Sequence, residues 1–138
     1  MKKLLIDTGA FLAQRNPSDQ HHARAQSAFR ALSDSPTLLF STEHILDETL
    51  TLIARRESYA YAAKTGSELL SSRALRWLDA TAADWDAALL AMRKFADQSV
   101  SFTDCLSFVL MKREGIRDVF AFDRHFTAAG FHLWPTSR

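Results

Sequence analysis

Lys3-Leu4-Leu5-Ile6-Asp7-Thr8, near the N-terminus, takes a short apolar run directly into an aspartate. A second apolar run, Val119-Phe120-Ala121-Phe122, meets Asp123 in the same way. Each run has the length and composition of a buried strand. In parallel sheets, ligands bind outside the carboxyl ends of the strands, so we expect the two carboxylates to meet at one edge of a sheet. Because unpaired carboxylates at close range repel each other, this pattern indicates a site for a divalent cation.

Strand-like segments alternate with helical patterns between and around these two runs. The expected strands are residues 4–6, 37–40, 75–78, 119–122 and 131–134. This alternation predicts a parallel sheet with helices on both faces. Neither a repeat nor a low-complexity linker interrupts the chain, and we expect residues 1–138 to form a single domain.

One helix start and the face of the helix that follows it can be predicted in detail. Thr81-Ala82-Ala83-Asp84 resembles a capping box with Asp in place of Glu. The helix that it opens carries Trp85, Leu89, Met92 and Phe95 at helical spacing. We expect these four side chains to pack against the core.

The composition is ordinary for a globular protein, with 47% apolar and 24% charged residues. A formal net charge of +1 neither indicates nor excludes a nucleic-acid binder, because local patches matter more than the sum. The single cysteine, Cys105, cannot form an intrachain disulfide, which is consistent with a reducing compartment. Since no apolar run reaches the length of a signal-peptide core or a membrane span, we expect a cytoplasmic protein without membrane contact.

Two further acids are candidates for the same site. Asp104 begins a predicted helix, where the helix dipole alone can account for it, and the preceding Thr103 adds a hydroxyl that could orient a carboxylate. Glu48 lies well inside its helix, at the border of an apolar stripe, so the dipole does not explain it and its charge needs a partner. The neighbouring Asp47 points farther toward solvent.

The resulting set of acids contains no histidine or thiolate. Oxygen ligands of this kind suit Mg²⁺ or Mn²⁺, which favour the hydrolysis of phosphodiesters. Four acids among sixteen are weak evidence for a metal site by number alone. The prediction depends on their positions in the expected fold. The pair His21-His22 is left out of the set, because adjacent helical residues diverge by about 100° and we expect both at the surface.

Four motifs in the sequence resemble those of PIN-domain ribonucleases. They are Leu5-Ile6-Asp7-Thr8, Ile45-Leu46-Asp47-Glu48-Thr49, Ser101-Phe102-Thr103-Asp104 and Phe122-Asp123-Arg124-His125-Phe126. Their order and spacing are most similar to the VapC-type toxins of bacterial toxin–antitoxin pairs. The resemblance implies a PIN-like three-layer α/β/α sandwich with a central, mostly parallel sheet. It also implies an Mg²⁺- or Mn²⁺-dependent endoribonuclease, usually a homodimer, that a cognate antitoxin inhibits.

The resemblance also implies roles for individual residues. The metal-binding and catalytic acids would be Asp7, Glu48, Asp104 and Asp123. Thr8 and Thr103 would be supporting hydroxyls, and Gly9 stands where many relatives have Asn or Ser. The implied reaction is attack of water on an RNA phosphodiester, which leaves a 5′-phosphate and a 3′-hydroxyl, and one of the carboxylates would accept the proton of the water.

An RNA substrate would also need cationic contacts to its phosphates. The candidates, which follow acidic motifs or helix ends, are Arg15, Arg55, Arg56, Arg124 and His125.

Two alternatives keep the fold and change the function. A metal-dependent phosphatase or phosphotransfer domain would use the same acids, although Thr8-Gly9 stands where a phosphoaspartyl hydrolase would have a second nearby acid. A non-cleaving RNA-binding module with the same fold would have little use for four converging acids. The sequence leaves open which RNA is cut and whether Mg²⁺ or Mn²⁺ is preferred.

Overall fold

The structure, a computed structural model, describes residues 1–136 and is organised around one five-stranded sheet. The strands are β1 (Lys3–Ile6), β2 (Leu38–Thr42), β3 (Leu75–Leu78), β4 (Asp118–Phe120) and β5 (His132–Trp134). The α-helices are α1 (Thr8–Arg15), α2 (His22–Ser33), α3 (Glu43–Arg56), α4 (Tyr59–Ser71), α5 (Ala82–Lys94), α6 (Phe102–Glu114) and α7 (His125–Ala128), and a 3-10 turn spans Ala96–Gln98. The sheet order is β3-β2-β1-β4-β5, and every neighbouring pair is parallel.

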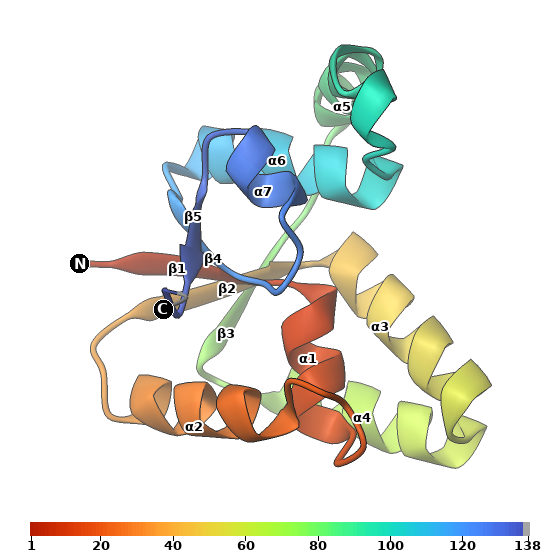
Figure 1. Cartoon of the computed structure of the whole chain (residues 1–138), viewed down its shortest axis with the longest axis vertical. Coiled ribbons are helices and arrows are strands. Elements are labelled where there is room, and N and C mark those ends of the chain that lie inside the picture. Colours follow the sequence, from red (N-terminus) through yellow and green to blue (C-terminus); the bar gives the residue numbers. More distant parts are fainter. Residues whose placement is uncertain (137–138) are drawn as a thin grey trace.

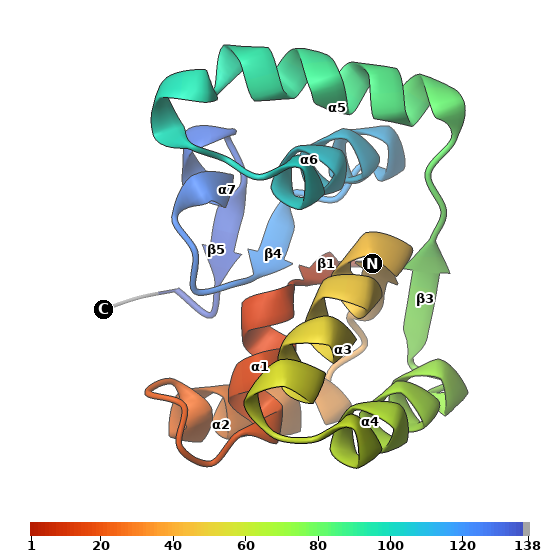
Figure 2. The ribbon, with the colours of Figure 1, turned by 90° about the vertical axis from the view of Figure 1, so that its right-hand side faces the viewer.

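Helices cover both faces of this sheet (Figures 1 and 2). Helices α1, α2 and α4 lie on one side of the sheet, and α3 packs against α1 and α4. Helices α5, α6 and α7 lie on the other side. The predicted three-layer α/β/α sandwich is therefore confirmed, and its sheet is parallel throughout. Within residues 1–136, no helix combines the length and the apolar composition needed to cross a bilayer.

The strand order reverses between β1 and β4. From β1 the chain proceeds outward to β2 and β3, and it then returns to place β4 on the opposite side of β1. Ligands in open parallel sheets bind at such a reversal, outside the carboxyl ends of the two central strands. The prediction that the second acidic strand runs directly into Asp123 is wrong in detail, because β4 ends at Phe120 and Asp123 lies in the loop that follows.

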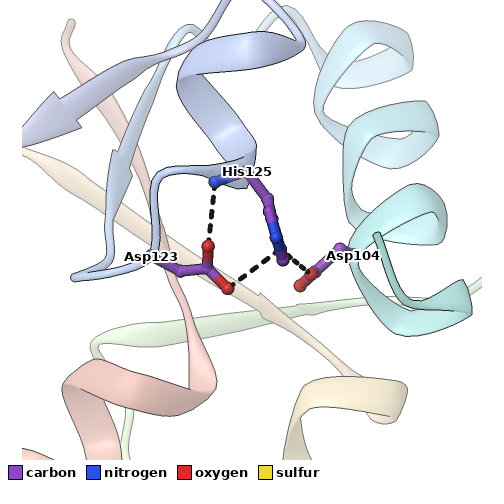
Figure 3. Close-up of side chains that lie close together, drawn as sticks. All are labelled: Asp104, Asp123 and His125. Carbon is purple, nitrogen blue, oxygen red and sulfur yellow. Dashed lines mark hydrogen bonds and ion pairs between the residues drawn. The ribbon is translucent and has the colours of Figure 1, made fainter. Parts of the chain in front are cut away.

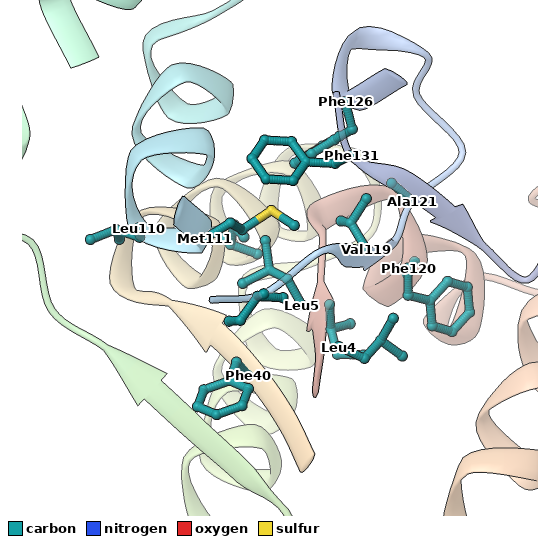
Figure 4. Close-up of a cluster of buried hydrophobic side chains, with 14 of the residues drawn as sticks. Leu4, Leu5, Phe40, Leu110, Met111, Val119, Phe120, Ala121, Phe126 and Phe131 are labelled. Carbon is teal, nitrogen blue, oxygen red and sulfur yellow. The ribbon is translucent and has the colours of Figure 1, made fainter. Parts of the chain in front are cut away.

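The core forms on both faces of β1, which is the central strand. Its residues Leu4, Leu5 and Ile6 are fully buried, as expected for a strand with parallel neighbours on both sides and helices above and below. Figure 4 shows Leu4 and Leu5 among apolar side chains from several other elements. These include Phe40, Leu110, Met111, Val119, Phe120, Phe126 and Phe131.

The predicted capping box at the start of α5 is present. The backbone N–H of Asp84 donates to Thr81 Oγ1 at 3.3 Å, and the backbone N–H of Thr81 donates to Asp84 Oδ2 at 2.8 Å. The Asp84 carboxylate also accepts from the guanidinium of Arg113 on α6. The backbone hydrogen bond from Thr81, with a smaller contribution from the Arg113 charge, lowers the pKa of Asp84. These contacts start α5 and tie it to α6.

The predicted packing of α5 is mostly wrong. Trp85, Leu89 and Met92 are 50%, 52% and 36% exposed, and we call these three residues the α5 stripe. Ala88 is instead fully buried on the inner side of α5. Phe95, directly after the last residue of α5, packs its ring against that of a buried phenylalanine. The predicted helix is present, but α5 is an outer element, and no other helix or strand of residues 1–136 covers its apolar stripe.

The burial of β1 predicts the cost of removing one of its side chains. We expect Leu5→Ala to lower the free energy of unfolding by about 2–5 kcal/mol, because the side chain is fully buried in the central strand. Leu70→Ala is the matched control, since Leu70 is 60% exposed on α4 and its truncation should change stability by less than about 0.5 kcal/mol. Urea denaturation followed by circular dichroism measures both values, and equal losses would contradict the assigned core.

Candidate active site

Asp7 is the most buried of the predicted acids. It follows β1 directly, is the N-cap of α1, and is 6% exposed. Burial raises the pKa of Asp7 to about 8, and the negative charge of the nearby Asp104 adds to the effect. A hydrogen bond from the backbone of Thr8 opposes this rise. An ionised Asp7 is therefore unfavourable here unless a positive charge compensates it.

Asp104 and Asp123 approach each other from different elements, and His125 lies between them (Figure 3). Asp104 comes from the first turn of α6, whereas Asp123 and His125 come from the β4–α7 loop and the first residue of α7. His125 Nδ1 lies 3.1 Å from Asp104 Oδ2 and 3.2 Å from Asp123 Oδ2. The backbone N–H of His125 also donates to Asp123 Oδ1 at 2.8 Å. Burial raises the pKa of Asp104, and the hydrogen bond to His125 partly offsets this rise.

All four predicted acids line one hollow of about 340 Å³. Glu48 reaches it from α3, while the neighbouring Asp47 is exposed and accepts a hydrogen bond from Thr51 at 3.4 Å, as the sequence predicted for its orientation. The hollow is lined by Asp7, Thr8, Gly9, Glu48, Leu52, Ser99, Ser101, Asp104, Asp123 and His125. Their convergence agrees with a shared site, and the catalytic role of each acid stays a prediction.

Of the two hydroxyls predicted to support the acids, one lines the hollow and the other does not. Thr8 lines the hollow, and its Oγ1 is buried without a hydrogen-bond partner. Thr103 does not line the hollow, and its carbonyl accepts a hydrogen bond from the Ser107 hydroxyl at 3.0 Å. Ser99 and Ser101 line it instead, and sequence reasoning missed them as site residues. Ser101 could have been predicted, because a serine three residues before an acid is a common pattern at a helix start. In the structure Ser101 is the N-cap of α6.

The predicted RNA-binding cations are divided between the site and the rest of the surface. Arg15 lies at the opposite end of α1 from Asp7, and its Nη1 is 2.5 Å from Glu68 Oε1, while its contact with RNA stays a prediction. Both partners line a second, larger hollow of about 610 Å³, at the amino ends of β2 and β3, which contains none of the four acids. Arg55 and Arg56 are exposed at the end of α3. The remaining two candidates follow Asp123 directly, and Arg124 is exposed.

His21 supports the loop that carries Asp123, which the sequence did not predict. Its ring stacks on Phe122, with centroids 4.1 Å apart and an interplanar angle of 6°. The guanidinium of Arg24 lies 5.6 Å from the centre of the same ring. His22 is also half-buried, with Nδ1 2.7 Å from a backbone oxygen of α1, so the expectation that both histidines are exposed at the surface is wrong.

The donors of this hollow fit a hard divalent cation. Four carboxylates converge there, and the burial of two of them raises their pKa values in the protein alone. A cation would offset this unfavourable burial of charge. The unpartnered Thr8 hydroxyl supplies a further polar atom for a ligand or its water.

The pKa of Asp7 makes the stability of the metal-free protein depend on pH. Because this pKa is about 8 in the folded protein and near 3.8 in the unfolded chain, the folded state binds more protons between these values. The free energy of unfolding should therefore fall as pH rises through this range, by up to about 1.4 kcal/mol per pH unit. We expect Asp7→Asn to remove this contribution, so that the variant gains stability over the wild type between about pH 4 and pH 8.

Urea titrations with a metal chelator present, repeated across this pH range, measure the difference between the two proteins. A difference in the free energy of unfolding that does not change with pH would contradict the prediction that the buried Asp7 carboxyl is protonated in this range.

Comparison with known proteins gives a consistent result along almost the whole chain. The family model described as PIN domain matches residues 4–132. A 23S rRNA-specific endonuclease of Mycobacterium tuberculosis, VapC20, is 31% identical over 128 residues, which cover 93% of this chain and 95% of the relative.

Solved structures agree with this match. The crystal structure of Mycobacterium tuberculosis VapC20, described as a Sarcin-Ricin loop cleaving toxin, has a TM-score of 0.83 and 30% identity, over 93% of this chain and 95% of that one. The VapBC2 complex of Rickettsia felis, bound to a DNA fragment from its promoter, contains a chain with a TM-score of 0.71 and 12% identity. That match covers 95% of this chain and 96% of that one, and it supports the fold alone.

Proposed function

The chain belongs to the PIN-domain family and, within it, to the VapC-type toxins, and we propose that it is a metal-dependent endoribonuclease that hydrolyses RNA phosphodiester bonds. The observation that carries this proposal is the convergence of four acids, from separate parts of the chain, on one hollow at the reversal of the strand order. The likeness to an endonuclease along nearly the full length of both chains supports the same activity.

The four acids would hold Mg²⁺ or Mn²⁺ in this hollow. When bound, such an ion lowers the pKa of a water molecule and offsets the charge that develops on the phosphoryl group. One of the carboxylates that line the hollow would accept the proton of the attacking water. The Thr8 and Ser101 hydroxyls, which line the same hollow, would orient these carboxylates or the water.

Three of the five predicted cations are the ones that we propose for the first tests of RNA binding. Arg55 and Arg56 follow Glu48 by seven and eight residues on α3, so they share its helix face. Arg124 follows Asp123 directly. Each of these arginines is exposed and lies close in the sequence to an acid of the hollow. From there it could contact a phosphate on either side of the scissile bond.

Ribosomal RNA is the substrate that we propose for the first tests. VapC20, the relative at 31% identity, is named for its action on 23S rRNA, and its match covers 95% of its own length. Incubation of total bacterial RNA with the purified protein, followed by mapping of the new 5′ ends, distinguishes cleavage of 23S rRNA from cleavage of transfer or messenger RNA.

The acids themselves give the sharpest test of the activity. We expect Glu48→Gln to reduce RNA cleavage in the presence of Mn²⁺ by about 10²-fold or more, because it removes a charge from the hollow. Asp47→Asn is the matched control, since Asp47 is the adjacent acid on α3 but faces solvent, and its cleavage rate should remain near that of the wild type. Undiminished cleavage by a folded Glu48→Gln variant would contradict the proposed site.

A cognate antitoxin protein is the proposed inhibitor of this activity. The relative that matches this chain over 93% of its length is described as a toxin, and an uncontrolled ribonuclease would damage the cell that makes it. A protein inhibitor that covers the hollow would keep the enzyme inactive until it is removed.

The α5 stripe is the surface that we propose for a homodimer. It is apolar and exposed, and two α5 helices packed antiparallel around a two-fold axis at Leu89 would cover each other's stripes. Asp86 and Arg93 flank the stripe on one side, three residues before and four residues after Leu89. In this arrangement Asp86 of one subunit faces Arg93 of the partner subunit, so the charges are complementary as well.

The dimer proposal predicts a change of mass on mutation. We expect Leu89→Arg to weaken self-association by at least about tenfold, because it places two like charges at the two-fold axis. Leu70→Arg adds the same charge at an exposed leucine on α4 and should leave the mass unchanged. Sedimentation equilibrium measures both variants beside the wild type, and a wild-type monomer at micromolar concentration would refute the interface.

A further inference from the structure

His125 is held in the hollow by its own neighbours in the sequence. Its backbone N–H binds one oxygen of Asp123, and its ring nitrogen lies beside the other oxygen of the same carboxylate. The stacking of His21 on Phe122 supports the same loop. The direction of the imidazole is therefore fixed by local structure, and Nδ1 points at the two carboxylates (Figure 3).

The spacing of the three donor atoms suits one ion. Two ligands that bind one octahedral cation at about 2.1 Å and at right angles lie about 3.0 Å apart. The distances from His125 Nδ1 to Asp104 Oδ2 and Asp123 Oδ2 are 3.1 and 3.2 Å. One ligand atom from each of the three residues lies within 4.8 Å of the other two. An ion could thus contact all three side chains without a large rearrangement.

A second observation at the hollow points independently to a ligand. Thr8 is 5% exposed, and its Oγ1 makes no hydrogen bond although it belongs to the same hollow. Buried hydroxyls normally have a hydrogen-bond partner. Water bound to an ion in this hollow would be such a partner for Thr8, so a hydrated ion fits the hollow better than a dry packing of side chains does.

We propose that His125 Nδ1 is a direct ligand of the cation held by Asp104 and Asp123, so that this centre is a mixed nitrogen–oxygen site that favours transition-metal ions over Mg²⁺. The inference rests on the proposed metal-dependent function and refines the identity of its ion. Imidazole binds first-row transition ions well, whereas Mg²⁺ takes oxygen ligands. For this role the neutral imidazole carries its proton on Nε2, which leaves the Nδ1 lone pair for the ion.

The bound ion can report its own ligands. We expect electron spin echo measurements on the full chain loaded with Mn²⁺ alone to show a directly coordinated nitrogen, and labelling of histidine with ¹⁵N should change the modulation accordingly. In His125→Asn the nitrogen signal should disappear, and the affinity for Mn²⁺ should fall by about tenfold or more. The affinity for Mg²⁺, measured by competition, should change by less than about threefold, since Mg²⁺ depends on the oxygen ligands.

Two further variants complete the design. His132→Asn is the matched control, because His132 is an exposed residue of β5 that does not line the hollow, and it should retain the nitrogen signal. His125→Asp replaces the nitrogen by an oxygen ligand, and we expect it to bind Mg²⁺ more tightly relative to Mn²⁺ than the wild type does.

The possible outcomes separate this inference from the function on which it rests. Mn²⁺ that binds to the wild type without nitrogen coupling overturns the role of His125 and leaves a metal-dependent nuclease with oxygen ligands. A wild type that binds no Mn²⁺ overturns both proposals. The wild-type spectrum decides between these results even if a variant fails to fold.

Discussion

The parallel pairing of β1 with β4 is the contact on which the rest of the molecule depends. The backbone N–H of Asp7 donates to the carbonyl of Phe120 at 3.0 Å and carries the pairing one residue beyond β1. The connections that follow the two strands leave toward opposite faces of the sheet, so the space beyond the strand ends stays open. Asp7 and Asp123, which are more than a hundred residues apart in the sequence, meet only because these strands are neighbours.

Burial of charge is the cost of placing four acids in this space. Desolvation is the largest cause of the raised pKa values of Asp7 and Asp104, and repulsion between carboxylates adds to it. The fold provides only partial compensation, through His125 beside two acids and a backbone hydrogen bond at Asp7. A cluster with so little internal compensation is more stable with a cation than without one, which connects the electrostatics to the proposed chemistry.

The sequence predicted the sheet well because its strands are short, apolar and bounded by turn residues, and β3 agrees residue for residue. It placed the acids together because parallel strand ends must share an edge. It failed where packing between distant elements decides the outcome, as on α5, whose helical period was visible while the absence of a covering layer was not. The position of His125 between Asp104 and Asp123 was hidden for the same reason, since it depends on how α6 lies relative to the β4–α7 loop.

The buried start of α1 also links ion binding to proton release. With a pKa of about 8, Asp7 keeps its proton through the neutral range in the protein alone, and a cation that binds its ionised form must displace that proton. Asp7 cannot move out to solvent to avoid this, because Leu5 and Ile6 hold the preceding strand in the core. A cation that neutralises the acids therefore stabilises a site that is already assembled. The affinity for the ion should change with pH as Asp7 ionises, and ion binding should not require the chain to fold at the same time.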